Sequence, residues 1–250
     1  MSVVDEYELK ARTAPGLIVA LPIIADVLLV VPSISNWGIL TASGVCGVAL
    51  IYGLGRVAQA RGEKIEQHLW NSWGGPPSTR FIRDNDTTFT PELKQTIRDA
   101  VRMKLSATLP KAHSELKNGE SADQVRFDVF RRVRQYLRMH DPRGLWHRHN
   151  IEYGFCRNLL GCRQLWLAVA SIATVMALAY GVRGKAGIVN PASAVGLLST
   201  ISAAYLGWWL LPGATKRCAE NYAESAWMSF IEIQPRKVVR RGIEKQSAQP

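Results

Sequence analysis

The stretch QLWLAVASIATVMALAYGV, residues 164–182, runs for 19 residues without a charged side chain. About 20 apolar residues, each rising about 1.5 Å, are enough to cross the hydrocarbon core of a bilayer. A surface helix of a soluble domain instead alternates an apolar face with a polar one. The stretch therefore predicts a transmembrane helix.

Three other parts of the chain have the same character, with uncharged runs at residues 13–25, 27–55 and 186–215. Together the runs predict membrane spans at residues 14–31, 37–55, 165–182 and 193–211. The expected fold is all-α, with four transmembrane helices arranged as two hairpins and a basic helical cytosolic domain inserted between them. These runs exclude a purely soluble enzyme, a secreted disulfide scaffold and a disordered tail protein.

Basic residues predict the orientation of the spans. The segment from residue 56 to residue 163 holds 20 Lys and Arg against 12 Asp and Glu, and the segment from residue 216 onward holds 7 against 4. Cytoplasmic flanks of membrane spans carry an excess of Lys and Arg. We therefore expect both termini and the middle segment to be cytoplasmic.

The same patterns divide the chain into four predicted parts. These are an N-terminal segment with the first hairpin (1–55), the basic helical domain (56–163), the second hairpin (164–215), and a cytosolic C-terminal helix with a basic tail (216–250). Within the basic domain, Thr90 before Pro91 predicts a helix N-cap, and a capping-box pattern at Ser121 predicts the start of a second helix. A near-heptad apolar stripe from Ala219 to Ile233 predicts a helix that either lies on the membrane or joins subunits.

The second helix of the basic domain carries an arginine stripe, formed by Arg131, Arg134 and Arg138. One interpretation is a solvated surface near anionic lipid headgroups. The other is a recognition face for an anionic ligand such as a nucleotide, because a guanidinium group binds phosphate through two directed hydrogen bonds.

A second candidate site is the segment from Trp70 to Arg80, which is rich in Gly and Pro and is predicted to be an ordered loop. Its tryptophans, Trp70 and Trp73, with Arg80 and Arg83 beside them, suit the stacking of a base and the binding of a phosphate. Alternatively, the two indoles only anchor the domain to its own core or to the bilayer surface.

Asp26 is an ionisable residue inside the first predicted span. A carboxylate in the bilayer costs roughly 2.5 to 3.5 kcal/mol, so it should face protein or water. Three interpretations are open: Asp26 lines a conducting path, it is a protonated hydrogen-bonding group, or the span is shifted so that it lies near an interface. Conduction would require an oligomer.

Catalytic signatures are weak. Two Arg/His pairs, Arg134 with His140 and Arg143 with His149, match the loose spacing of HEPN-type ribonucleases. There is no Walker, Gly-x-Ser-x-Gly or His-Glu-x-x-His pattern, so no cofactor or metal is expected, and the chain is expected not to be an enzyme unless it is such a ribonuclease. Four cysteines without a Cys-x-x-Cys spacing are expected to be thiols without a role: Cys46, Cys156, Cys162 and Cys218.

Three strings carry a resemblance: DEYELKAR (5–12), SWGGPP (72–77) and YGFCRNL (153–159). They resemble strings in a family of uncharacterised bacterial four-span membrane proteins, which implies a multi-pass protein of the bacterial inner membrane and brings no activity with it. In organisation alone the chain is also similar to membrane effectors of bacterial antiphage systems, in which a cytosolic ligand domain controls a membrane part.

These observations lead to one main hypothesis. The chain is expected to be an oligomeric inner-membrane effector or ion channel whose basic domain senses an anionic ligand such as a nucleotide in antiviral defence. Its partners would be the lipid bilayer, copies of itself and that ligand. The alternatives are a membrane anchor that recruits a soluble partner enzyme, and a membrane-tethered HEPN-like ribonuclease.

Overall fold

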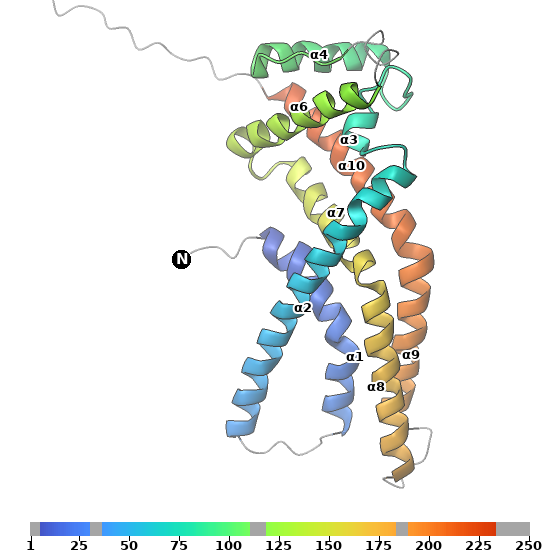
Figure 1. Cartoon of the computed structure of the whole chain (residues 1–250). Helices are drawn as coiled ribbons and strands as arrows, with labels where there is room; N and C mark the ends of the chain where they lie inside the picture. The colour runs from blue at the N-terminus through green and yellow to red at the C-terminus, as the bar shows by residue number, and fades with distance from the viewer. Residues whose placement is uncertain (1–5, 31–36, 111–118, 184–189, 234–250) are drawn as a thin grey trace, which may run out of the picture.

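A computed structural model describes residues 6–30, 37–110, 119–183 and 190–233, and leaves out the side chains of residues 26–30 and 37–46. Every regular element in the described residues is helical, which confirms the all-α prediction (Figure 1). In chain order these are η1 (Glu8–Thr13), α1 (Ala14–Val30), α2 (Trp37–Ser72), α3 (Pro77–Arg80), α4 (Pro91–Leu105), α6 (Gly119–His140), α7 (Leu145–Gly161), α8 (Arg163–Arg183), α9 (Pro191–Tyr205), η2 (Leu206–Leu210) and α10 (Leu211–Glu232).

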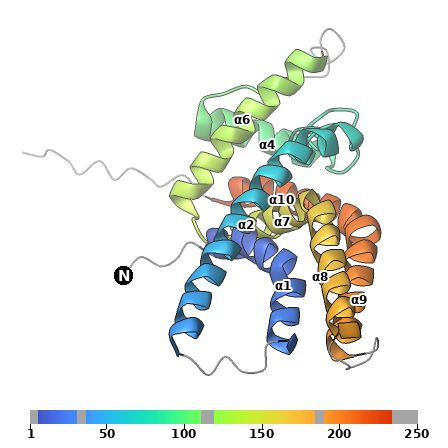
Figure 2. The ribbon, with the colours of Figure 1, turned by 60° about the horizontal axis from the view of Figure 1, so that its bottom comes forward.

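The helices form two regions. Helices α1, α8, α9 and the first half of α2 extend together from one side of the molecule. The remaining helices pack above them and form what we call the upper region (Figures 1 and 2). In the described residues, two helices are long and apolar enough to cross a membrane: Arg163–Arg183, and the continuous helix Pro191–Glu232 formed by α9, η2 and α10. Within the first predicted hairpin, α1 has 17 residues, and the side chains of residues 26–46 lie outside the description.

Helices α8 and α9 place small residues inside and large apolar residues outside. From Ala170 onward, the buried residues of α8 are all small and repeat every three or four positions: Ala170, Ala173, Ala177 and Gly181. By contrast, Val175 is 65% exposed and Leu198 66% exposed. Helix contact through small residues and an apolar outer surface are typical of helices surrounded by lipid.

Close approach between α8 and α9 depends on Gly196. A Cβ atom added at Gly196 would lie 2.9 Å from the Cα atom of Thr174. Beside this contact, the hydroxyl oxygens of Thr174 and Thr200 lie 2.9 Å apart and share a hydrogen bond. Small and hydroxyl-bearing residues thus form this contact between α8 and α9.

The core of the upper region is aromatic and centres on α10. Its buried members include Phe81, Ile97, Val101, Val133, Leu137, Trp146, Trp227 and Phe230. The Trp227 indole is completely buried and donates a hydrogen bond of 2.9 Å to the carbonyl oxygen of Ser78. The near-heptad stripe of α10 is thus part of this core, which corrects the expectation that it lies on the membrane or joins subunits.

Several local predictions also have clear outcomes. Thr90 is the N-cap of α4 and accepts a hydrogen bond of 3.3 Å from the Leu93 amide, as predicted. Helix α6 begins at Gly119, two residues before the predicted start. The loop prediction for residues 70–80 is wrong at both ends: α2 continues unbroken from Trp37 to Ser72, and residues 77–80 form the short helix α3. The turn follows at Gly74 and Gly75, whose φ angles of +78° and +120° favour glycine.

Candidate ligand-binding site

A cavity of about 630 Å³ lies in the upper region, above the point where η1 continues into α1. Its walls come from η1 with the preceding Tyr7, which we call the N-terminal helix, from α2, α3, α6, α7 and α10, and from the segment joining α6 to α7. The lining residues are Tyr7, Arg12, Glu66, Trp70, Ser78, Phe127, Phe130, Arg134, Arg138, Pro142, Trp146, His147, Asn150, Tyr153, Arg157 and Tyr222. A volume of this size falls in the usual range of small-molecule sites, about 300 to 1,000 Å³.

Positive charge dominates the cavity wall. Four arginines line it, Arg12, Arg134, Arg138 and Arg157, and Glu66 is the one carboxylate among its lining residues. Arg157 pairs with Glu66 at 2.7 Å, and Arg12 pairs with Glu8 one turn away on η1. The wall therefore keeps a surplus of cationic groups.

Arg134 and Arg138 supply that surplus. They lie one turn apart on α6, and within the described residues neither has a carboxylate at salt-bridge distance. The guanidinium of Arg134 lies 5.9 Å from the centre of the Phe130 ring. Two adjacent guanidinium groups without an acidic partner are well suited to a phosphate or carboxylate, because each offers paired donors.

Aromatic rings form much of the remaining wall. Trp70 and Phe127 meet edge to face with their ring centres 6.1 Å apart, and Tyr153 and Tyr222 lie nearly parallel, 6.3 Å apart. Trp146 is fixed by a hydrogen bond of 2.7 Å from its indole to the Asp141 carbonyl oxygen. Such rings give flat apolar surfaces on which a planar ligand group can stack.

Hydrogen bonds around Glu66 connect α2 to α7. The Tyr153 hydroxyl donates to the same Glu66 oxygen as Arg157, at 2.8 Å. Burial, reinforced by the Glu66 charge, raises the pKa of Tyr153 far above its usual value, so this phenol stays protonated. Asn158, next to Arg157, donates 2.8 Å to the Ala11 carbonyl oxygen. The same part of α7 thus contacts both α2 and the N-terminal helix.

Tyr222 faces the arginine pair from α10. Burial raises its pKa to about 12, although the charge of Arg134 acts in the opposite direction. The phenol is therefore neutral at physiological pH and offers a hydroxyl group rather than a competing negative charge. The wall consequently remains attractive to an anion.

The structure brings together three of the candidate residues predicted from the sequence: Trp70, Arg134 and Arg138. The prediction missed Arg12 and Arg157 in the same wall. Arg157 belongs to the YGFCRNL string, so its place in that string was the available signal. No spacing pattern in the sequence links Arg12 to the arginines of α6, because these residues share a cavity wall only through the packing of helices that are distant in sequence.

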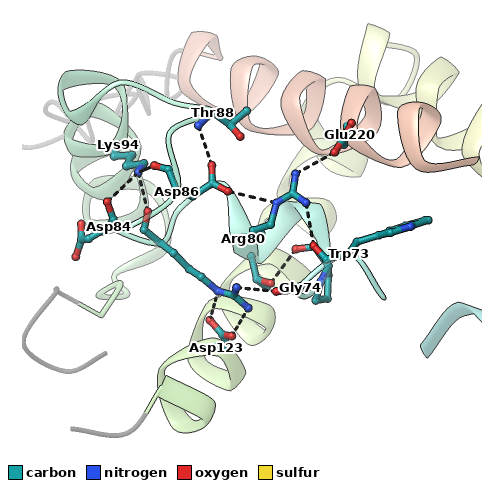
Figure 3. Close-up of polar contacts among 12 residues, drawn as sticks. Trp73, Gly74, Arg80, Asp84, Asp86, Thr88, Lys94, Asp123 and Glu220 are labelled. Atoms are coloured by element: carbon teal, nitrogen blue, oxygen red, sulfur yellow. Dashed lines mark hydrogen bonds and ion pairs between the residues drawn. The ribbon is translucent and has the colours of Figure 1, made fainter. Parts of the chain in front are cut away.

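Arg80 and Arg83 lie away from the cavity, among acidic partners. Arg80 contacts Glu220 at 2.9 Å and Asp86 at 3.3 Å, and it also donates to the Trp73 carbonyl oxygen at 3.0 Å (Figure 3). Arg83 binds Asp123 through two hydrogen bonds, of 2.5 and 3.1 Å. These guanidinium groups hold the segment after α2 against α6 and α10, and Trp73 packs against the core of the upper region.

The remaining candidates lie elsewhere. Arg131 is exposed, lies 4.0 Å from Asp128, and lines a shallow outer groove on α6 that also borders Arg134 and Arg138. The side chain of Asp26 lies outside the described residues.

The proposed ribonuclease histidines contact backbone carbonyl groups. His140 Nδ1 lies 2.8 Å from the Tyr136 oxygen, and His149 Nδ1 lies 3.2 Å from the Asn221 oxygen. Across the described part of the chain, no group of three or more His, Cys, Asp or Glu side chains is arranged to hold a metal ion. The described geometry thus offers an arginine and aromatic cavity as its best developed site.

No protein-family model, curated protein or solved structure matches this chain.

Proposed function

We propose that the protein is an oligomeric membrane effector of the bacterial inner membrane, in which a cytosolic cavity senses an anionic ligand and controls the membrane helices. The observation that carries this proposal is the pair Arg134 and Arg138, which lack carboxylate partners among the described residues and line a cavity with aromatic walls. The outward-facing apolar side chains of α8 and α9 support the membrane assignment.

The chemistry of the cavity suits a nucleotide. Guanidinium groups bind phosphate oxygens through directed hydrogen bonds, and Trp70 or Tyr153 offers a ring for a base. A plain inorganic anion would use the arginines alone and leave the aromatic wall without a partner. The ligand expected here therefore combines at least one phosphate with a planar base.

The helices that form the cavity also lead toward the membrane. Arg12 lies in η1, which continues into α1, and Glu66 lies in α2, whose first half is the second predicted span. Tyr222 lies in α10, which is continuous with α9. A ligand that draws these walls together would change the positions of the span ends, and in an oligomer this would open a path that Asp26 helps to line.

Binding to the purified, detergent-solubilised chain tests the proposal. The probes are AMP, ATP and cyclic di-AMP, with inorganic phosphate as the comparison. A charge-assisted hydrogen bond contributes about 1.5 to 3 kcal/mol, so the double variant Arg134→Gln/Arg138→Gln should weaken nucleotide binding at least about 100-fold.

Arg131→Gln is the single-charge control, because it removes one guanidinium group from the same helix outside the cavity. It should change nucleotide binding less than about threefold, as expected for an exposed charge. Equal losses in the two variants would show that the arginines act only through general charge. No binding of any nucleotide to folded protein would contradict the proposal.

We also propose a role in antiphage defence, which is supported by the combination of a ligand domain with membrane helices. Expression in bacteria challenged with phage tests this role. Wild-type protein should limit phage growth with loss of membrane potential, and the double arginine variant should do neither. Protection without any change in membrane potential, together with co-purification of a soluble enzyme, would favour the membrane-anchor alternative.

A further inference from the structure

Two cysteines from distant parts of the chain meet at the contact between α7 and α10. The Sγ atoms of Cys156 and Cys218 lie 3.5 Å apart, and both side chains are half-buried. A disulfide has an S–S distance of about 2.05 Å, so the two sulfur atoms need to approach by only about 1.5 Å to form the bond. The pair is therefore placed for oxidation within one molecule.

An apolar cavity leads to these sulfur atoms. It has a volume of about 380 Å³, and its lining residues are Lys10, Ala14, Ile151, Glu152, Phe155, Cys156 and Cys218. Ala14 is the first residue of α1, so this cavity lies beside the start of the first predicted span. An apolar molecule coming from the membrane surface would reach the thiols here.

We propose that Cys156 and Cys218 form an oxidation site that reacts with an organic hydroperoxide and closes to a disulfide. The apolar walls select an oxidant with a hydrocarbon group over hydrogen peroxide, because transfer of apolar surface out of water is favourable. This site is separate from the arginine cavity and does not depend on the function proposed for it.

Cys218 is the attacking group. The hydrogen bond shared by the two thiols lowers the pKa of Cys218, and the charge of the adjacent Arg217 acts in the same direction, against burial and the charge of Glu152. The same hydrogen bond and burial raise the pKa of Cys156. Since the thiolate is the reactive form of cysteine, Cys218 reacts first and Cys156 resolves the product.

The proposed reaction converts two thiols and one hydroperoxide into a disulfide, an alcohol and water. The Cys218 thiolate attacks the terminal oxygen of the hydroperoxide, the O–O bond breaks, and the alkoxide takes a proton to leave as an alcohol. Cys218 is then a sulfenic acid. Cys156 gives up its proton and attacks that sulfur, the S–O bond breaks, and hydroxide takes the proton to leave as water. Two thiols are oxidised by two electrons, and one hydroperoxide is reduced.

The disulfide would join two walls of the arginine cavity. Cys156 precedes Arg157 and lies one turn beyond Tyr153 on α7, and Cys218 lies one turn before Tyr222 on α10. A covalent link at this level fixes the distance between α7 and α10. Oxidation at the membrane surface would therefore hold the cytosolic end of α10 in one position.

The test uses the reduced, full-length protein in detergent, treated with cumene hydroperoxide or hydrogen peroxide and then with a maleimide. Mass spectrometry of the digested protein should find a peptide that links Cys156 to Cys218 within one chain. Each rate is divided by the rate for glutathione with the same oxidant, which removes the intrinsic reactivity of the peroxide. The normalised rate should be at least about tenfold higher for cumene hydroperoxide, because its apolar group is buried in the cavity.

Variants assign the roles. Cys156→Ser should leave a sulfenic acid on Cys218 that dimedone traps, whereas Cys218→Ser should leave Cys156 unreacted. Cys162→Ala is the control and should leave the reaction unchanged, because burial raises the pKa of Cys162 to about 11.

Three results would overturn the proposal: no Cys156–Cys218 peptide from the wild-type chain, normalised rates that are equal or favour hydrogen peroxide, or dimedone trapping on Cys156 in the Cys218→Ser variant.

Discussion

Glu66→Gln should weaken the fold and strengthen ligand binding at the same time. In the wild-type chain, one oxygen of Glu66 accepts from Arg157 at 2.7 Å and from the Tyr153 hydroxyl at 2.8 Å. Glutamine preserves the shape of the side chain and removes its charge. Arg157 then becomes a buried cation without its carboxylate, in a wall that already holds three other arginines.

The expected magnitudes follow from burial. The side chains of Arg157 and Glu66 are 11% and 18% exposed, and removing one partner of a buried ion pair costs about 3 kcal/mol or more. At about 2 to 4 °C per kcal/mol, the melting temperature should fall by about 6 to 12 °C. If a bound phosphate lies about 8 Å from the Glu66 carboxylate, that charge opposes binding by about 2 kcal/mol at an effective dielectric constant of about 20. After salt screening, nucleotide affinity should therefore rise about tenfold.

Thermal unfolding in detergent and nucleotide titration at low temperature measure the two effects. Glu63→Gln is the control, because Glu63 is exposed one turn away on α2 and does not line the cavity. It should leave both quantities nearly unchanged. If Glu66→Gln folds and binds nucleotide less tightly than the wild-type chain, the cavity is not an anion site of the kind described.

Four further substitutions test the packing and the lipid exposure of the helices. Gly196→Ala should destabilise the protein by about 1 to 3 kcal/mol, seen as a lower melting temperature, because its methyl group meets the Thr174 backbone at 2.9 Å. Gly47→Ala should be neutral or stabilising by up to about 1 kcal/mol in the same measurement, because an added Cβ there has no neighbour within 4 Å among the described atoms. Trp227→Ala should cost about 3 to 5 kcal/mol in denaturant unfolding, since its side chain is 0% exposed. Trp209→Ala, at a residue 79% exposed, should leave stability unchanged but remove fluorescence that brominated lipid quenches.

The all-helical fold was predictable because uncharged runs of 19 to 30 residues have few other interpretations. The limits of the regions were less predictable. Helix α2 continues from residue 37 to residue 72, so the change from apolar to basic sequence at residue 56 falls inside one helix. Composition records the change of environment, whereas backbone hydrogen bonding continues across it.

The candidate site was only partly predictable, for an electrostatic reason. A count of arginines does not show which of them have acidic partners. Arg80 pairs with Glu220, 140 residues away, and Arg83 pairs with Asp123, 40 residues away. Arg134 and Arg138 have no such partner among the described residues, and this difference depends on how the distant helices pack.

Ion flux from liposomes that contain the purified protein tests whether the ligand controls the membrane helices. The probe is the nucleotide that binds tightest among AMP, ATP and cyclic di-AMP. This nucleotide should raise flux through the wild-type protein and leave the Arg134→Gln/Arg138→Gln variant at its basal level. A folded, lipid-inserted protein that binds the nucleotide and shows no change in flux would contradict it.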